Sequence, residues 1–467
     1  MKIKNLIAIS LATGLIGCAL MGPDYHKPNT NDPQQLPNQN RDLLATTESA
    51  NLPMLAWWKN FNDPQLNQLI ESALINNNNI QIAIGNIEAA RGQLRQIEFA
   101  WLPIVGGNAS YTNQAKGQYS LSFTPSYSLN IFQLIRAQEY AKANFEAVKA
   151  AKDTVRLSII SQVATGYFTL LGQDYQLQLQ QQLVADLSEL LALAKLQYQA
   201  GLYSLYQLQS YEQQYATAQA QIPIIQNNII VAQNALRVLL NQNPGDIKRG
   251  EKFNQLNSYG IIPINLPSNI LRNRPDIRQA EQQLIMANAN IGVAVATFFP
   301  TINLTGAGGV ASGSLNSLFG SNTDFWTTTA GATMPILNFG IYGQIQTAKG
   351  EYYAAYYNYL QTVRSAFAAV DNDLSAHQQL TLSMQQQEKF YQSTQLSYQL
   401  AESSFTQGLF SKPQLLQSDV ALTQAALSLQ QSKLQQLGTI VQLYQDLGGG
   451  YAYQNYESTI KFNDSHD

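Results

Sequence analysis

Residues 119–131 of the chain read Tyr-Ser-Leu-Ser-Phe-Thr-Pro-Ser-Tyr-Ser-Leu-Asn-Ile. Apolar side chains occupy the odd positions and Ser, Thr or Asn the even ones, which is the period of a β-strand with one apolar and one small polar face. The stretch is long for a strand in a soluble protein but suits a tilted strand that spans a membrane. Because Pro125 cannot donate to a ladder, we expect a β-bulge at that residue.

Such a strand needs partners, and three further stretches can supply them. The partner in the first hairpin is expected from Leu102 to about Thr112. A second hairpin is expected to pair Pro300–Ala307 with Phe325–Leu337. The chain therefore predicts four strands in two hairpins.

Charge is nearly absent from both hairpins. Between residues 102 and 135 the one charged residue is Lys116, and between 298 and 346 it is Asp324. Both fall in predicted loops, 112–118 and 311–324, and the second loop also holds Ser317; we expect these loops to be extracellular. The alternative is a water-soluble hairpin, but its outer face would usually carry charges.

One plan is repeated twice along the chain. Pro103 and Pro300 are 197 residues apart, whereas Phe132 and Phe339 are 207 apart. The second copy must therefore carry ten more residues between Pro300 and Phe339. Each half predicts a helix, two strands, a very long helix, a Gly-containing break and another long helix.

The longest helical stretches run over about 132–199 and 339–407. Each would reach roughly 100 Å at 1.5 Å per residue, a length that suits a coiled-coil tube better than a globular core. Apolar residues spaced by three and four predict a seam, comprising Leu179, Leu183, Leu187, Leu190 and Ala194.

The amino terminus has the pattern of a secretion signal. Two lysines precede an apolar stretch, 6–16, which is too short to span a bilayer. Cys18 follows Leu15-Ile16-Gly17 and resembles the cysteine of the bacterial lipobox, which is acylated and becomes the new amino terminus. A free or buried cysteine is the alternative. By the same resemblance, Ala19 after the cysteine favours sorting to the outer membrane.

Composition argues against several other classes of protein. The 27 Lys+Arg and 30 Asp+Glu residues give a net charge of −3 without basic clusters, which disfavours a nucleic-acid partner. A single cysteine excludes an internal disulfide framework, and the three histidines are far apart in sequence. His377 is predicted to lie on the surface of a helix. Residues 306–311 match a dinucleotide fingerprint, but a loop-like composition follows where a helix is required, so we expect no cofactor beyond a covalent lipid on Cys18.

Several specific motifs surround these elements. Residues 266–278 read Leu-Pro-Ser-Asn-Ile-Leu-Arg-Asn-Arg-Pro-Asp-Ile-Arg, and Ala280-Glu281, residues 287–294 and Phe299-Pro300 follow. Nearer the amino terminus stand Cys18, Gly22-Pro23-Asp24-Tyr25, Pro28, Trp57-Trp58, Phe61, Asp63-Pro64 and Leu66. Over nearly all of the mature chain, this set resembles the outer membrane factor (TolC-like) family, and within it the NodT-type lipoproteins.

The resemblance implies an α+β membrane protein of the bacterial outer membrane. In such a homotrimer four strands per subunit close one 12-stranded β-barrel, which a long periplasmic α-helical coiled-coil barrel continues, with a small equatorial domain. The implied partners are outer membrane lipid, a periplasmic adaptor (membrane fusion) protein and an inner-membrane pump, with the RND type favoured. Physics agrees with the trimer, because four strands alone would expose unpaired edges to lipid.

The resemblance also implies a periplasmic gate at the helix turns, here 201–208 and 408–415. The family often has an acid after each turn, whereas this chain has Gln207 and Gln414, which puts strong cation selectivity in doubt. Since neither amide titrates, we expect gating to respond weakly to salt and pH. The alternative is that these are ordinary helix-turn residues. The candidates for the gate and for adaptor contact are Gly201, Leu202, Gln207, Gly408, Leu409, Pro413, Gln414, Leu416 and Asp419.

The function expected from these features is that of a passive exit duct for drugs or other small solutes in a tripartite efflux system, and no motif predicts an enzyme. The outer component of a type I protein secretion system remains the alternative. A lipid-anchored coiled-coil adhesin or rod is a third possibility, against which the two amphipathic hairpins argue.

The expected domain boundaries follow from the repeat. They are a signal peptide (1–17), a lipid-anchored tether (18–53), a first helical segment (54–101), hairpin 1 (102–131), a long helical hairpin (132–241), an equatorial segment (242–274), a helix of the second repeat (275–299), hairpin 2 (300–338), a second long helical hairpin (339–447) and a C-terminal tail (448–467).

Overall fold

The computed structural model describes residues 22–30, 49–114, 116–256 and 274–453. The predicted signal peptide, Cys18 and most of the predicted tether lie outside these described residues. The chain divides into two compact units: unit 1 comprises 1–31, 84–151 and 276–363, and unit 2 comprises 32–83, 152–275 and 364–467.

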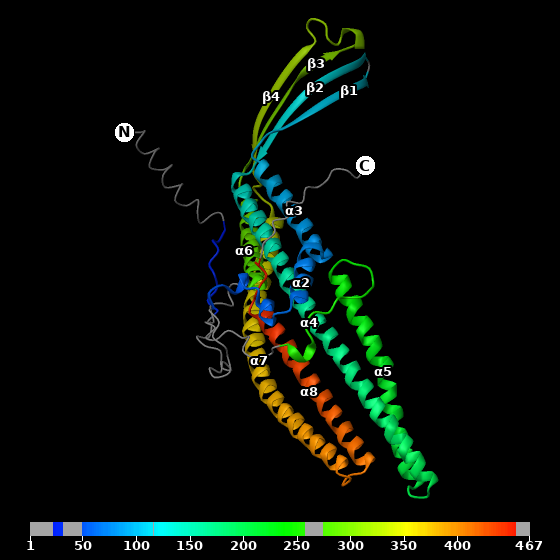
Figure 1. Ribbon diagram of the computed structural model, residues 1–467. Coiled ribbons are helices and arrows are strands. Elements are labelled where there is room, and N and C mark those ends of the chain that lie inside the picture. Colours follow the sequence, from blue (N-terminus) through cyan, green and yellow to red (C-terminus); the bar gives the residue numbers. More distant parts are fainter. Residues whose placement is uncertain (1–21, 31–48, 115, 257–273, 454–467) are drawn as a thin grey trace. The chain divides into compact units, whose positions relative to one another are not determined.

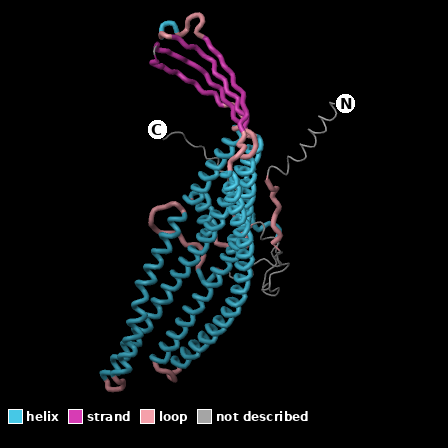
Figure 2. The backbone as a smooth tube through the Cα atoms, turned by 180° about the vertical axis from the view of Figure 1, so that it is seen from behind, coloured by secondary structure: helices cyan, strands magenta, loops and turns pink. Residues whose placement is uncertain are grey.

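Unit 1 contains one four-stranded antiparallel sheet in which consecutive strands are neighbours (Figure 1). Figure 2 shows the strands running side by side. Pairs of residues from Ile104↔Ser126 to Gln114↔Lys116 join the first two strands, and comparable ladders join the rest. The strands are β1 (Ile104–Gln114), β2 (Lys116–Leu129), β3 (Thr301–Ser312) and β4 (Asp324–Thr333).

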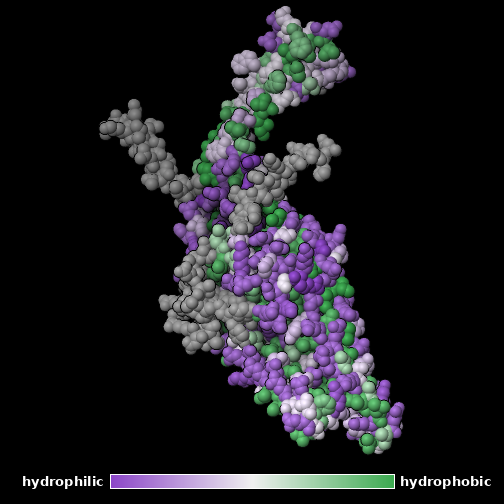
Figure 3. Space-filling view, in the orientation of Figure 1, coloured by the Kyte–Doolittle hydropathy of each residue, from purple (hydrophilic) through white to green (hydrophobic). Residues whose placement is uncertain are grey.

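The sheet is amphipathic, as the alternation along β2 predicts. Phe123 and Leu121 share a face with their ladder partners, including Val310, whereas Ser120 and Ser122 point to the other side. On the polar face Ser110 and Ser120 are joined by a hydrogen bond of 2.8 Å between hydroxyl oxygens. Hydrophobic side chains gather along the sheet in Figure 3, while the visible face of the helices is mainly hydrophilic.

The bulge expected at Pro125 is absent, because the residue pairs with Val105 in an unbroken register. On the other side of β2 the register is the same before and after the proline, at Phe123↔Gly308 and Ser126↔Thr305. Glycine accommodates the ring instead: a Cβ on Gly306 would lie 3.2 Å from Cγ of Pro125. The missing side chain on β3, rather than an extra residue on β2, makes room for the proline.

All four strands reach further towards the hairpin tips than predicted, so the hairpin loops are shorter, although β4 ends at Thr333 rather than at Leu337. Lys116 is the first residue of β2 and Asp324 the first of β4, so neither lies in a loop as expected. The first connection is residue 115 and the second is 313–323, which contains the short 3₁₀ helix η5 (Leu315–Ser317). This difference accounts for the ten extra residues of the second copy.

Long helices follow both hairpins. The two longest helices begin and end within one residue of the stretches predicted from sequence. The α-helices are α2 (Pro64–Asn76), α3 (Asn78–Phe99), α4 (Ile131–Gln199), α5 (Leu205–Leu239), α6 (Pro275–Ala296), α7 (Phe339–Thr406) and α8 (Lys412–Asp446), and the remaining 3₁₀ helices are η1 (Ser49–Met54), η2 (Trp57–Phe61) and η3 (Phe253–Gln255).

Within unit 1 the segment 22–30 is fastened to α6 and α4. Gly22 has a positive φ of 86° and lies so close to Gly292 that an added Cβ would be 2.8 Å from its Cα. The Asn288 amide donates to the Pro23 carbonyl at 2.9 Å, and the Arg136 guanidinium pairs with Asp24 at 3.0 Å. The Gly-Pro-Asp part of the sequence motif therefore attaches the segment 22–30 to α6 and α4.

Unit 2 is organised around the buried carboxylate of Asp63, which is fully inaccessible to solvent. It caps α2 by accepting from the backbone N–H groups of Gln65 and Leu66, at 2.8 and 3.2 Å. It also accepts from the Tyr167 hydroxyl of α4 at 2.8 Å and from the Glu251 N–H at 3.2 Å. One side chain thus joins α2, α4 and the segment that follows α5.

Aromatic residues complete this core. The Trp57 and Tyr444 rings are stacked, with centroids 4.9 Å apart and planes 4° apart, and both residues are inaccessible to solvent. Trp58, also fully buried, lies edge-on to Trp57. The Trp57-Trp58 motif therefore attaches the segment before α2 to α8.

None of the described helices is long and apolar enough to cross a membrane.

We predict that Asp63→Ala lowers the free energy of unfolding of unit 2 by about 2–4 kcal/mol, because it leaves several N–H and O–H donors in the core without an acceptor. Ser204→Ala, which removes an exposed helix cap, should cost about 1 kcal/mol. Thermal melting of both variants tests this, and equal losses would contradict the assigned importance of Asp63.

Candidate functional site

The two helix turns at the ends of the long helical hairpins have the same backbone structure. Gly201 and Gly408 have positive φ angles of 75° and 74°, a conformation that glycine adopts without strain. The next N–H, of Leu202 or Leu409, donates to the carbonyl of Gln197 or Ser404 at 2.8 or 2.9 Å. Both turns thus close α4 and α7 with the same glycine-terminated motif. In Figure 2 each hairpin of helices ends in such a loop.

Gln207 and Gln414, the expected gate amides, each form a capping box at the start of the next helix. The Gln207 amide oxygen accepts from the Ser204 N–H at 2.8 Å, and the Gln414 oxygen accepts from the Ser411 N–H at 2.8 Å. Pro413, in the first turn of α8, needs no hydrogen bond there. Locally, the glutamines order the turns.

Apolar side chains at the turns face solvent within unit 2. Leu202 is 74% exposed, Leu409 72% and Tyr206 83%. Exposed apolar groups of this size at two related tips are typical of a surface that another protein covers.

Leu416 is buried rather than displayed. It packs into a cluster that joins α4, α5 and α8 within unit 2, and three of the five residues of the predicted seam belong to the same cluster. The cluster consists of Leu183, Leu187, Leu190, Ala218, Leu416 and Val420. Leu416 therefore fixes the start of α8 against α4.

Asp186 of α4, which the sequence analysis did not single out, directly precedes Leu187 of this cluster in the chain. It is 6% exposed; one carboxylate oxygen accepts from the Gln182 amide at 2.9 Å, and the other has no partner among the described residues. Burial, reinforced by the charge of Asp419, raises the pKa of Asp186 to about 6. In the sequence, Asp186 could have been found as an acid that lies between the leucines of the predicted seam.

Asp419 of α8, one of the gate candidates from sequence, lies close enough to Asp186 for its charge to act on that group. Burial and the charge of Glu402 raise its pKa as well. An ion pair joins Lys412 of α8 to Glu189 of α4 at 3.2 Å, and both side chains are exposed. The prediction that gating responds weakly to pH rests on Gln207 and Gln414 alone and does not take Asp186 and Asp419, which titrate, into account.

The other residues singled out from sequence lie elsewhere. Ser317, in η5, shares hydrogen bonds of 2.6 Å with the hydroxyls of Ser312 and Ser314. His377 is not on the surface: it is 7% exposed, and burial lowers its pKa to about 4. The prediction was wrong because α7 is covered by α8 at this level, where the Gln436 amide donates to Thr381. Residues 306–311 lie in β3 and open no helix. No cluster of potential metal ligands occurs in the described part of the chain.

Comparisons with known proteins agree with this architecture. The model of the outer membrane efflux protein family matches residues 69–242 and 266–449. The chain belongs to this family.

Individual relatives match over almost their whole length. The solvent efflux pump outer membrane protein SrpC of Pseudomonas putida is 30% identical, with 97% of this chain and 99% of that protein aligned. The cation efflux system protein CusC of Escherichia coli O6:H1 is 29% identical, over 96% and 99%. The crystal structure of the open state of the Neisseria gonorrhoeae MtrE outer membrane channel superimposes with a TM-score of 0.80 at 27% identity, over 92% of this chain and 98% of that one.

These findings confirm the family, the α+β fold class, the outer membrane location and the role as the outer membrane component of an efflux system.

We predict that Asp186→Asn stabilises the contact of α4 with α8 above pH 6 but not below about pH 4. The folded pKa is raised, so ionisation of Asp186 costs stability progressively as the pH rises from about 4 to 6. Amide hydrogen exchange of residues 183–190, compared between variant and wild type at each pH, measures this. Glu212→Gln, at an exposed position of α5, is the control, and an equal effect of Asp186→Asn at pH 4 and 7.5 would refute the assignment.

Proposed function

We propose that three copies of this chain form the exit duct of a tripartite efflux system for small solutes. The observation that carries the proposal is the sheet: of its described strands, β1 and β4 each pair on one side only. In hydrocarbon an unpaired row of backbone groups costs several kcal/mol per group, so the edges must be paired with other copies. Three copies of four strands would then close a 12-stranded β-barrel with its Ser, Thr and Asn face lining a wet lumen.

The helical hairpins would continue the duct through the periplasm. In this proposal a periplasmic adaptor protein covers the exposed apolar tips at Leu202, Tyr206 and Leu409, and an RND-type inner-membrane pump delivers the solutes. The gate is formed by the turns around Gln207 and Gln414, held by the caps and by the packing of Leu416. Acylation of Cys18 adds a second attachment to the membrane.

The duct role makes a prediction about glycines of the sheet. A Cβ on Gly309 would lie 2.1 Å from the Leu121 carbonyl oxygen, whereas one on Gly331 would meet open space. Gly309→Ala should therefore abolish the SDS-resistant trimer and leave a deletion strain as drug-susceptible as the empty vector does. Gly331→Ala should form the SDS-resistant trimer and restore drug resistance. Full resistance with Gly309→Ala would contradict the proposal.

The same strains separate the two transport functions. If wild type restored export of secreted proteins without changing drug susceptibility, the alternative of type I protein secretion would replace small-solute efflux.

The topology is tested by labelling single cysteines on whole cells with an impermeant maleimide. We expect Ser317→Cys, between β3 and β4, to react without permeabilisation. Tyr206→Cys, at the exposed start of α5, should react only after the outer membrane is permeabilised. The reverse pattern would overturn the orientation.

A further inference from the structure

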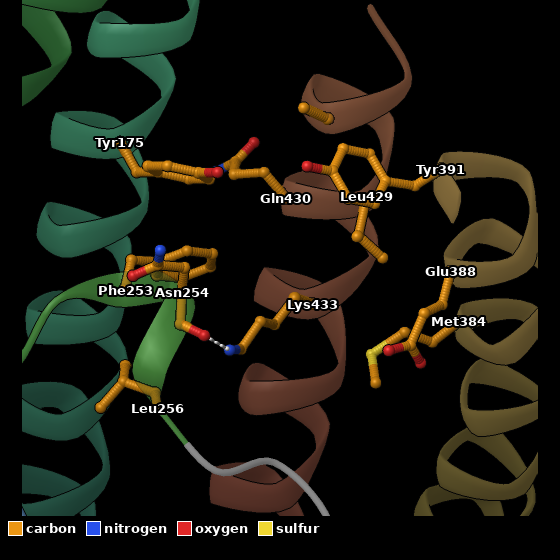
Figure 4. A pocket seen from close by; sticks show the side chains of 11 residues that line it. Tyr175, Phe253, Asn254, Leu256, Met384, Glu388, Tyr391, Leu429, Gln430 and Lys433 are labelled. Carbon is orange, nitrogen blue, oxygen red and sulfur yellow. Dashed lines mark hydrogen bonds between the residues drawn. The ribbon is translucent and has the colours of Figure 1, made fainter. Parts of the chain in front are cut away.

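A cavity of about 460 Å³ lies within unit 2, away from the helix turns. Its walls come from α4, η3, α7 and α8 (Figure 4). The volume is in the range of small-molecule sites, and the mixture of apolar walls with a few polar groups is typical of them. The lining side chains used below are Tyr175, Phe253, Met384, Glu388, Tyr391 and Lys433.

Aromatic rings form one wall of this cavity. The Tyr175 and Phe253 rings are stacked, with centroids 6.0 Å apart and planes 27° apart, and Phe253 is almost fully buried. Tyr391 and the buried Met384 come from α7, across the cavity. A flat apolar group placed between these walls would have ring or thioether contacts on both faces.

Lys433 brings a positive charge to the same space. Its ammonium lies 5.7 Å from the centre of the Phe253 ring and donates to the Asn254 carbonyl at 2.9 Å. That carbonyl is its one hydrogen-bond acceptor among the described residues, so two of its three N–H donors are left for a ligand. Figure 4 shows this side chain reaching from α8 towards η3.

The charge of Lys433 is incompletely balanced. Burial lowers its pKa to about 8, and the opposing influence of Glu388 does not compensate. Glu388 is exposed, so water screens its charge. An anionic group on Lys433 would restore the lost solvation with a charge-assisted hydrogen bond.

We propose that this cavity binds a small aromatic carboxylate, whose ring lies between the Tyr175–Phe253 stack and the α7 wall and whose carboxylate accepts from Lys433. One cation suits one carboxylate better than a phosphate ester of higher charge. None of the residues that line the cavity belongs to the proposed gate turns, so binding can be tested independently of gating. Because its walls come from four elements, a bound ligand would hold these elements together and raise the stability of unit 2.

The experiment is calorimetric titration of the full chain, in lipid nanodiscs at pH 7, with 2-naphthoate. We expect a Kd at or below about 1 mM. The neutral analogue 2-naphthalenemethanol should bind at least about tenfold more weakly, because it lacks the charge that Lys433 recognises. Lys433→Met should weaken naphthoate binding by a similar factor and Lys433→Arg should keep it. Lys389→Met, an exposed lysine on α7, is the matched control and should change nothing.

The unmodified protein supplies an independent test. Lys433 is charged below its pKa of about 8 and loses its proton above it, so naphthoate affinity should fall severalfold between pH 7 and pH 9. The affinity for the neutral analogue should stay constant. No binding of naphthoate up to about 2 mM, a pH-independent Kd, or tighter binding of 2-naphthylmethylammonium than of naphthoate would each overturn the proposal.

Discussion

Among the described strands, β1 and β4 each pair on one side only, and the backbone N–H and C=O groups along their outer edges constrain the rest of the fold. Hydrocarbon offers no hydrogen bonds, so such a sheet is viable in a membrane only if other copies pair with it. The polar face of Ser, Thr and Asn then needs water, which a lumen supplies. The proposed trimer follows from these two requirements together.

The helices that follow the hairpins leave the sheet without a long connection. β2 ends at Leu129 and α4 begins at Ile131, and only five residues separate Thr333 of β4 from Phe339 of α7. Any closed arrangement of the strands therefore imposes a matching arrangement on the beginnings of these helices. Because the plan is repeated, both halves have the same glycine turn and the same capping box.

Glutamine is used in this chain where charge would be costly or unnecessary. At the turns, Gln207 and Gln414 cap helices without introducing charges. Within unit 2, the Gln180 and Gln430 amides donate to the carbonyls of Ala218 and Gly172 and so join neighbouring helices. One of the buried acids, Asp186, lies where α4 meets the leucine cluster and makes that contact sensitive to pH. The sequence has few charged residues because neutral glutamine side chains form many of the hydrogen bonds between its packed helices.

Sequence alone determined the elements and their order, because period-2 alternation, helical periodicity and glycine breaks are local properties. The 207-residue spacing paired Gly201 with Gly408 and Gln207 with Gln414, and the structure gives each pair the same geometry. Tertiary structure alone decided what depends on residues distant in the chain. Gly306 takes the place of a bulge opposite Pro125, and α8 buries His377. Likewise, Lys433 meets Phe253 across a separation of 180 residues to line a cavity. Burial and pKa are set by such neighbours, which no local pattern specifies.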